Sequence, residues 1–421
     1  MSGIGPILLF DKSTLQSLSV DESVWFDTHY YPCITPLFFV ETLADLEKEV
    51  DEGRTPEDVV GNLAEKTPTG GHPNIYHQTL CINELLGHAE IEMDHRIIVS
   101  EGRRVASGSR RGFVMDEPQE VVALRRWEEG KFLEVERTLA RDWRKALSGL
   151  DLGVVYQQGR DVIASLGRPR NLAEAKAMAV KLLDKPASRW ARDALLRFNV
   201  PDPTRRAILQ RWSDRGSPPL KEVAPYTAFV VTVDTFFAIA LGTDLISRER
   251  PSNKVDIAYL YYLPFCMAFT SNDRLHERTA PVFLDDKQVF IRGQDLKADL
   301  ARLDAYYDAF PDAVKLRGTM SFATWPPTDG DFLTASLWDK LMRPDWRDLA
   351  KKPPMTMSPE TKKKLLEQMR EMKNAPAGGP TDFDSDDANA VLISRRVRAS
   401  RGKWRRLPPE VEKRAREEGE E

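Results

Sequence analysis

The stretch that decides the fold is ILLFDKSTL, residues 7–15. A short apolar run that ends at an acidic residue is typical of a buried strand, so we predict a strand over residues 7–10. A helical pattern follows, and a second short strand is predicted over residues 33–35. Pro36 suits the first turn of the next helix, which we expect over residues 37–50. Strand, helix, strand and helix in this order open an α/β unit.

The same pattern returns after a long helical block. Residues 117–198 have apolar residues at helical spacing, and the apolar stretches 226–247 and 256–265 predict further helices. Strands are predicted over residues 267–271 and 288–291, each followed by helical sequence. We therefore expect one α/β domain with a parallel sheet, interrupted by an all-α insertion.

We divide the chain into four parts on this basis. The α/β domain comprises residues 1–115 and 226–345, and the helical insertion comprises residues 116–225. The last part, residues 346–421, is a charged tail with a polar run that contains Gly-Gly-Pro and four aspartates. Segments of this composition bury too little apolar surface to fold, so we predict that the tail is disordered.

The composition excludes several classes of protein. The chain has 61 Lys and Arg against 65 Asp and Glu, a formal net charge of −4. That balance rules out a cationic coat for non-specific nucleic-acid binding but leaves a local basic patch open. The 3 cysteines include no CxxC pair, which rules out a disulfide framework or a Cys-ligated zinc site and fits a reducing compartment. Neither GxxxxGK[ST] nor GxGxxG occurs, so nothing supports a nucleotide cofactor.

We expect a soluble, cytoplasmic protein with no membrane partner. The first residues lack the basic region of a signal peptide, and their apolar run stops at Asp11. The most apolar stretch, residues 228–241, contains Asp234 and is shorter than the roughly twenty residues that span a bilayer.

Four acidic residues stand at equivalent places in the predicted α/β units. Asp11 follows the first strand, and Glu41 lies partway along the second helix. Asp256 begins the helix that leads to the strand over residues 267–271, and Asp273 follows that strand. The carboxyl ends of parallel strands share one edge of a sheet, where ligands bind. We therefore expect these four side chains to converge.

A cluster of carboxylates requires a cation, because several carboxylates cannot all stay ionised side by side without one. Asp and Glu oxygens without a His or Cys cluster favour a hard ion, so we predict Mg²⁺ or Mn²⁺ as the cofactor. A carboxylate-held pair of such ions, about 3.5–4 Å apart, can clamp the attacking and leaving oxygens in phosphodiester hydrolysis.

The segments around these acids resemble a known family. They are LLFDKSTLQSL at residues 8–18, ITPLFFVETLADL at residues 34–46 and VDIAYLYYLPFCMAFTSNDRL at residues 255–275. They look like the successive motifs of the PIN domain, a metal-dependent nuclease fold also used by toxins and RNA-processing enzymes. In that family an acid ends the first strand, a Glu lies on the second helix and two acids flank the fourth strand.

The resemblance implies a PIN-like fold and a ribonuclease activity that depends on Mg²⁺ or Mn²⁺. Matched motif by motif, it implies that the metal-binding and catalytic residues are Asp11, Glu41, Asp256 and Asp273. The similar segments lie in two blocks at the two ends of the α/β domain. The long stretch between Glu41 and Asp256 must therefore supply the remaining core elements together with an extra helical module.

The acids also have simpler structural explanations. Asp11 could cap the helix that follows it, although Ser13 and Thr14 could cap that helix instead. Asp256 could likewise cap its own helix, as could its polar neighbours. Asp273 could belong to an Asx turn.

Substrate contacts are predicted at two places. Ser271 and Asn272 border the proposed site and could orient a phosphate or a metal-bound water. The run RRVRASRGKWRR, residues 395–406, is basic with one aromatic residue, which suits phosphate neutralisation and stacking on an unpaired base. The residues singled out there are Arg395, Arg396, Lys403 and Trp404. Such a run is also typical of a solvated or partner-binding tail.

The sequence as a whole predicts a metal-dependent ribonuclease, with RNA favoured over DNA as the partner. The first alternative is a catalytically silent PIN-like module that binds nucleic acid or protein, the latter through the helical insertion or the tail. The second alternative is the toxin part of a toxin–antitoxin pair.

Overall fold

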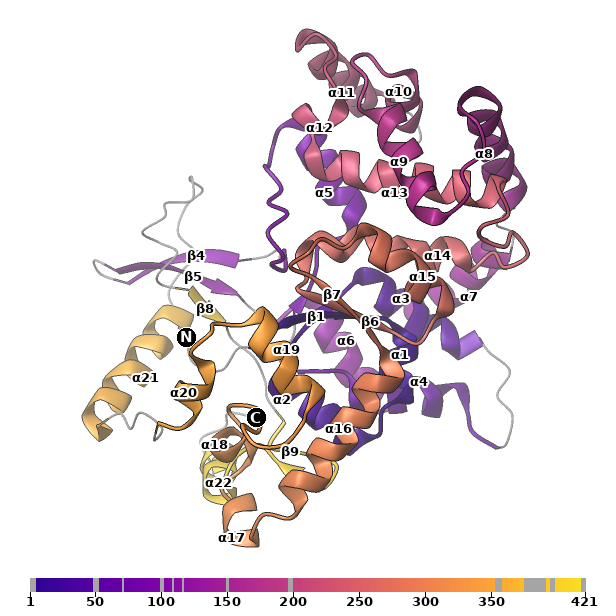
Figure 1. Cartoon of the computed structure of the whole chain (residues 1–421). Coiled ribbons are helices and arrows are strands. Elements are labelled where there is room, and N and C mark those ends of the chain that lie inside the picture. Colours follow the sequence, from indigo (N-terminus) through magenta and orange to yellow (C-terminus); the bar gives the residue numbers. More distant parts are fainter. Residues whose placement is uncertain are drawn as a thin grey trace.

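The structure, a computed structural model, describes residues 5–47, 53–69, 72–98, 102–107, 110–115, 117–148, 151–195, 200–352, 358–374, 391–393 and 398–417. These residues form a mostly helical α/β fold in which a parallel sheet lies between layers of helices (Figure 1). The prediction of a mixed α/β fold with a parallel sheet is confirmed at this level.

The main sheet has the strand order β3-β2-β1-β6-β7, and all neighbouring strands are parallel. The strands are His72–Pro73 (β3), Tyr31–Ile34 (β2), Ile7–Phe10 (β1), Ala268–Ser271 (β6) and Val289–Arg292 (β7). β1 is central: Leu9 stands opposite Cys33 of β2 on one side and opposite Phe269 of β6 on the other. The strand therefore joins two segments that the helical block separates in the sequence.

Successive residues of β1 point into two different hydrophobic cores. Leu9 belongs to the cluster that we call core 1, and Leu8 and Phe10 belong to the cluster that we call core 2. All three side chains are fully buried. Because side chains alternate along a strand and both faces of this sheet are covered, the strand has a continuous apolar sequence. That property is what made residues 7–10 recognisable as a strand.

Each core is closed by its own set of helices. Those that contribute to core 2 are α1 (Lys12–Ser17), α2 (Val20–His29), α3 (Pro36–Ala44), α4 (Pro56–Lys66), α6 (Gln119–Glu128), α7 (Glu134–Ser148), α16 (Gly293–Asp308), α19 (Leu333–Leu341) and α20 (Trp346–Ala350). Those that contribute to core 1 include α5 (His77–Leu86), α8 (Leu152–Leu166), α9 (Leu172–Leu183), α13 (Pro225–Gly242), α14 (Asn253–Ala258), the 3-10 helix η2 (Tyr259–Phe265) and α15 (Arg274–Phe283).

The remaining elements form a third core, a second sheet and short segments, and of these the segments that hold Leu46 and Trp404 also contribute to core 2. A third, smaller core is formed mainly by α10 (Arg189–Leu195), α11 (Asp202–Asp214) and α12 (Leu220–Val223). A second sheet contains β4 (Gly102–Ser107), β5 (Arg110–Met115) and β8 (Val391–Ile393). Further short elements are η1 (Asp45–Glu47), α17 (Asp312–Lys315), α18 (Thr319–Phe322), α21 (Pro359–Asn374), β9 (Ser400–Arg401), β10 (Trp404–Arg405) and α22 (Pro409–Glu417).

The helices of the predicted insertion belong to two packing units. α6 packs on α4 and α7 packs on α3, so both extend core 2. α8 and α9 pack instead on α13, and together with α10–α12 they form the upper lobe in Figure 1. The lobe therefore begins at α8 and includes α13, whereas the sequence pattern placed the insertion at residues 116–225.

The predicted disorder of residues 346–421 is wrong for part of the described tail. Trp404 in the β9–β10 hairpin is 3% exposed and lies edge-on against Trp25 of α2, with ring centroids 4.6 Å apart. Lys403 forms ion pairs with Asp304 and Asp308 of α16 at 2.9 and 3.3 Å. One buried aromatic ring and cations paired with distant acids dock this hairpin, and composition averaged over the whole tail does not reveal such contacts.

One described helix, α13, has the length and composition of a membrane span, with a mean hydropathy of 1.4 over 18 residues. Of that stretch, 72% is buried inside the structure, as in a core helix. The helix is longer than the stretch 228–241 because Pro225 starts it earlier. The cellular location stays a prediction.

The crossing of α8 and α13 yields a stability prediction. A methyl group at Gly159 would lie 1.9 Å from the backbone carbonyl oxygen of Ala238, which cannot move aside without separating the helices. We expect Gly159→Ala to lower the free energy of unfolding by about 2 kcal/mol in urea denaturation. Gly153→Ala on the same helix is the control, because its nearest neighbour is the flexible side chain of Asp151. Equal stability of the two variants would contradict the packing described here.

Candidate functional site

The candidate site lies at the carboxyl edge of the sheet, where β1 and β6 end. Phe10 stands opposite Thr270, so the next residues, Asp11 and Ser271, are neighbours. The Ser271 hydroxyl donates a hydrogen bond of 2.7 Å to Asp11 Oδ2, and the Ser13 hydroxyl donates another of 2.7 Å to the same oxygen. Asp11 Oδ1 accepts from the backbone N–H of Thr14 at 2.9 Å. The Asp11 carboxylate is thus buried, 5% exposed, and held by three donors.

Glu41 reaches this edge from α3. Thr35 caps that helix and Pro36 occupies its first turn, which are the start signals seen in the sequence. Glu41 is partly buried, and its Oε2 accepts a hydrogen bond of 2.5 Å from the Tyr259 hydroxyl. Lys12 Nζ donates to the Glu41 backbone carbonyl oxygen at 3.4 Å. The carboxylate therefore has a fixed position beside η2.

The other two acids flank β6. Asp256 lies in the first turn of α14, and Asp273 caps α15 by accepting a hydrogen bond of 2.6 Å from the Leu275 N–H. Both side chains are partly exposed. The negative charges of Glu41 and Asp273 act on Asp256, and that of Asp11 acts on Glu41. The four acids are thus linked in neighbouring pairs, Asp11 with Glu41, Glu41 with Asp256, and Asp256 with Asp273.

His276 of α15 stands inside this group. Its Nε2 lies 2.7 Å from the Asp256 backbone carbonyl oxygen, which only accepts, so Nε2 carries a proton. Its Nδ1 lies 2.8 Å from Ser271 Oγ and 3.5 Å from Asp11 Oδ2. Because the Ser271 hydroxyl donates to Asp11, Nδ1 must also donate, and the ring is then an imidazolium.

The pKa values follow from burial and from these neighbours. Burial lowers the pKa of His276, but the hydrogen bond and charge of Asp11 and the contacts with Asp256 outweigh it and raise the pKa to about 9. Burial raises the pKa of Asp11, yet the combined contacts with His276, Ser13 and Ser271 hold it below its usual value. Burial raises the pKa of Glu41 above its usual value, although the bond from Tyr259 opposes the shift.

Asp256 has the most useful of these shifts. Burial raises its pKa, and the charges of Glu41 and Asp273 add to the effect, so that the pKa reaches about 7 although His276 opposes the shift. A carboxyl group with a pKa near neutrality can take up or release a proton at physiological pH. It is also a group that a nearby cation would ionise.

The structure also shows which of the acids cap helices. Asp11 is the cap of α1, whereas Ser13 and Thr14 lie inside the helix, so the suggestion that those two residues free Asp11 from capping is wrong. Asp256 does not cap α14, which has no side-chain cap.

Among the described residues, no group of three or more His, Cys, Asp or Glu side chains is arranged as it stands to hold a metal ion.

Ser271 and Asn272, the predicted substrate contacts beside the site, form hydrogen bonds within the protein. Ser271 is 2% exposed and is used to hold Asp11. The Asn272 amide nitrogen donates to the Ser13 carbonyl oxygen and to the Ser17 hydroxyl, each at 3.3 Å. Both residues therefore act as supports of the site.

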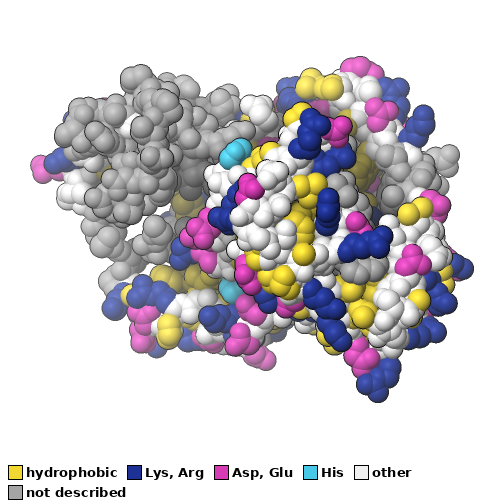
Figure 2. Space-filling model, turned by 90° about the horizontal axis from the view of Figure 1, so that it is seen from above, with side chains coloured by type: hydrophobic (Ala, Val, Ile, Leu, Met, Phe, Trp, Pro, Cys, Tyr) yellow, Lys and Arg dark blue, Asp and Glu magenta, His cyan; other side chains and the backbone are white. Residues whose placement is uncertain are grey.

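The basic run over residues 395–406 offers fewer groups for substrate binding than predicted. Trp404 is buried and its indole N–H donates to Asp304 at 2.7 Å, so its predicted stacking on a base is wrong. Lys403 is 40% exposed and paired with Asp304 and Asp308. Arg395 and Arg396 lie outside the described residues. On the face that Figure 2 shows, Lys and Arg side chains are interspersed with Asp and Glu.

Neither His276 nor Tyr259 is among the site residues predicted from the sequence. His276 stands three residues after Asp273, so it lies on the same side of α15 as that cap, which is a usable signal. Tyr259 lies three residues after Asp256, but only the tertiary contact with Glu41 reveals its role. Asp45, four residues after Glu41, is 1% exposed and forms an ion pair with Lys12 at 3.0 Å.

The shifted pKa of Asp256 predicts a pH-dependent gain in stability for Asp256→Asn. The folded state holds this proton up to about pH 7, whereas the unfolded state releases it near the ordinary pKa of 3.8. Stability is therefore lost as the pH rises through this window, and a neutral amide avoids the loss. We expect the advantage of Asp256→Asn in free energy of unfolding to grow by about 2 kcal/mol between about pH 5 and pH 8. Glu277→Gln, an exposed carboxyl on α15, is the control, and an advantage of Asp256→Asn that does not grow with pH would refute the assignment.

Comparison with known proteins identified no relative of this chain. The chain matches no protein-family model, no curated protein and no solved structure. The functional assignment must therefore come from the chemistry of the four carboxyl groups, His276 and the residues that hold them.

Proposed function

We propose that this chain is a metal-dependent nuclease that hydrolyses phosphodiester bonds, with RNA as the favoured substrate. The observation that carries the proposal is that Asp11 and Asp273 follow two adjacent parallel strands while Glu41 and Asp256 lie on flanking helices. The charges act in successive pairs, Asp11 on Glu41 and then Glu41 and Asp273 on Asp256. Crowded carboxyl groups that raise the pKa values of their neighbours form a place that a cation stabilises.

The donor set fits a hard divalent cation. Every carboxyl group in the cluster offers oxygen, the element that Mg²⁺ and Mn²⁺ prefer. Glu41, Asp256 and Asp273 are partly exposed and would hold the ion, and Asp11 would join them by exchanging one of its hydroxyl donors. Such an ion, when bound, lowers the pKa of water and stabilises charge on a leaving oxygen.

The residues of the chain position the carboxyl groups and set their charge. Tyr259 holds Glu41 through its hydroxyl, and Ser271 holds Asp11. Asp256, whose pKa is about 7 without a bound cation, would release its proton when the cation binds and would then contribute a carboxylate oxygen. His276, as a buried cation, keeps Asp11 ionised.

The placement of the acids relative to the strands supports a PIN-like fold as part of this proposal. Asp11 follows β1, Glu41 lies on the helix after β2, and Asp256 and Asp273 stand on either side of β6 in the sequence. β6 lies directly beside β1 in the sheet. This arrangement is the one that the resemblance implies.

A second candidate is a catalytically silent module that retains the fold. It is favoured by the saturation of Asp11, whose two oxygens already accept three hydrogen bonds and face the His276 imidazolium. In this candidate, the internal cation takes the place of a metal ion and the site serves stability alone.

A cleavage assay separates the two candidates. Labelled single-stranded RNA and DNA would be incubated with the wild type in Mn²⁺, in Mg²⁺ or in EDTA. We expect cleavage of RNA that requires the metal and falls at least about 100-fold in Glu41→Gln and in Asp273→Asn, because each substitution removes a charged oxygen from the cluster.

The control for this assay is Asp286→Asn, an exposed carboxyl in the turn after α15, which should retain full activity. Absence of metal-dependent cleavage by folded wild type would favour the silent module. Equal cleavage by the wild type, Glu41→Gln and Asp273→Asn would show that the activity does not come from this site.

A further inference from the structure

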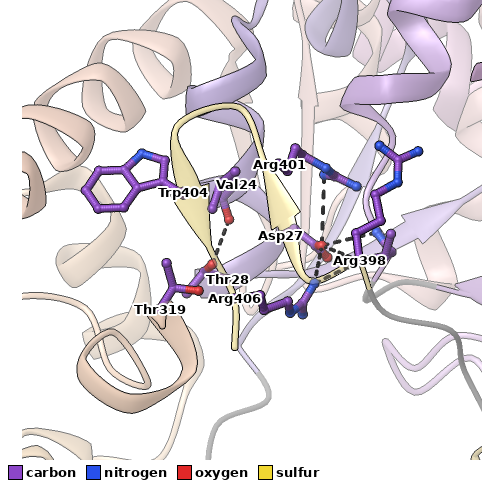
Figure 3. A pocket seen from close by; sticks show the side chains of 9 residues that line it. Val24, Asp27, Thr28, Thr319, Arg398, Arg401, Trp404 and Arg406 are labelled. Carbon is purple, nitrogen blue, oxygen red and sulfur yellow. Dashed lines mark hydrogen bonds and ion pairs between the residues drawn. The ribbon is translucent and has the colours of Figure 1, made fainter. Parts of the chain in front are cut away.

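A pocket lined by three arginines lies where the β9–β10 hairpin packs against α2 (Figure 3). The charged and hydroxyl-bearing residues that line it are Asp27, Thr28, Thr69, Thr319, Arg398, Arg401 and Arg406. All three arginines come from the C-terminal segment, and the other four residues come from the body of the protein. The pocket therefore exists only when that segment is docked.

The pocket is separate from the carboxyl cluster. Asp27 lies near the end of α2, just before β2 begins at Tyr31, and Thr69 stands shortly before β3 begins at His72. In a parallel sheet, these positions belong to the amino edge of the strands, whereas Asp11 and Ser271 mark the carboxyl edge. The two sites thus lie at opposite edges of the sheet.

The one carboxylate in the lining is already heavily used. Asp27 Oδ2 accepts hydrogen bonds from the Thr69 N–H at 3.1 Å and the Thr69 hydroxyl at 2.8 Å. The same oxygen accepts a bond of 2.9 Å from Arg406 Nη1, as Figure 3 shows. Arg401 Nη1 lies 4.0 Å from it, which is too long for a hydrogen bond. Asp27 also forms ion pairs with both Arg406 and Arg401, but it is the one carboxylate among three guanidinium groups, so the lining has an excess of positive charge.

Arg401 is the group that this arrangement leaves unsatisfied. Its side chain is 7% exposed, and its Nη2 donates to the Thr67 carbonyl oxygen at 2.8 Å. Its Nη1 is buried and has no hydrogen-bond partner among the described residues. A buried donor without a partner is costly, and a charged one more so.

Arg398, which also lines the pocket, is likewise a desolvated cation. Arg398 forms an ion pair with Glu128, which does not line the pocket. Burial and the charge of Arg401 lower the pKa of Arg398 to about 10, although the negative charge of Glu65 opposes the shift. Burial also lowers the pKa of Arg401. Desolvated cations this close together gain when an anion binds between them.

We propose that this pocket binds a phosphate group and thereby fastens the C-terminal segment to the body of the protein. Guanidinium groups recognise tetrahedral phosphate through paired N–H donors, and the Thr319 hydroxyl adds a further polar contact. Phosphate has enough acceptor oxygens for several donors at once, whereas the single carboxylate Asp27 leaves Arg401 Nη1 without a hydrogen bond. The phosphate can be inorganic or the terminal phosphate of a nucleotide chain.

The test is isothermal titration calorimetry of the full chain in EDTA, at an ionic strength kept constant with chloride. The EDTA keeps metal ions out of the carboxyl cluster. The probes are inorganic phosphate, a thymidine dinucleotide with a 5′ phosphate and the same dinucleotide without it. We expect saturable binding of the first two probes only, weakened about tenfold or more in Arg401→Gln and in Thr319→Val. The tighter of the two probes identifies the source of the phosphate.

The matched control is Arg405→Gln, since Arg405 lies between two lining residues but points to Glu412, 3.0 Å away, and is 44% exposed. This variant should bind phosphate as the wild type does. Thr319→Val keeps the shape of the side chain, so it tests the site even if Arg401→Gln does not fold. Absence of saturable binding by the wild type, or equal binding by Thr319→Val and the wild type, would overturn the proposal.

Discussion

The parallel pairing of β1 with β6 is the contact on which the rest of the structure depends. It joins two segments on either side of the helical block and places Phe10 opposite Thr270. A shift of one residue would turn Leu8 and Phe10 away from core 2, and it would separate Asp11 from the Ser271 hydroxyl. Packing of the two cores and geometry of the candidate site are therefore fixed by the same register.

The electrostatics of the site follow from its burial. Four carboxyl groups share one edge with a single buried imidazolium, which cannot compensate all of them. The structure responds by keeping Asp11 ionised against His276 and by letting Asp256 hold its proton to about pH 7. A divalent cation would allow Asp256 to ionise, so we expect cation binding at this edge to release a proton near neutral pH.

Much of the fold and the four acids could be predicted from the sequence, for a physical reason. β1 is buried on both faces, so its apolar run is visible, and Thr35-Pro36 marks the start of α3. Residues placed at strand ends converge because parallel strands share an edge. These are local signals, and they sufficed to single out Asp11, Glu41, Asp256 and Asp273.

What the sequence did not reveal depends on contacts between distant segments. Nothing local marks Tyr259 as the donor to Glu41, or Trp404 as a ring packed on Trp25. The charged tail has the composition of a disordered segment, yet Lys403 in it forms an ion pair with Asp304 on the body of the protein. Some of the basic residues that suggested nucleic-acid binding, such as Lys403, instead form ion pairs that dock the segment on the body of the protein.

The most direct test of the account is a titration of the wild type with Mn²⁺, followed by the electron paramagnetic resonance signal of the free ion. The account predicts saturable binding in the wild type that is at least about tenfold weaker in Glu41→Gln and in Asp273→Asn, and unchanged in Asp286→Asn. Absence of Mn²⁺ binding by the folded wild type, or equal binding by all of these variants, would contradict the claim that the four carboxyl groups form a cation site.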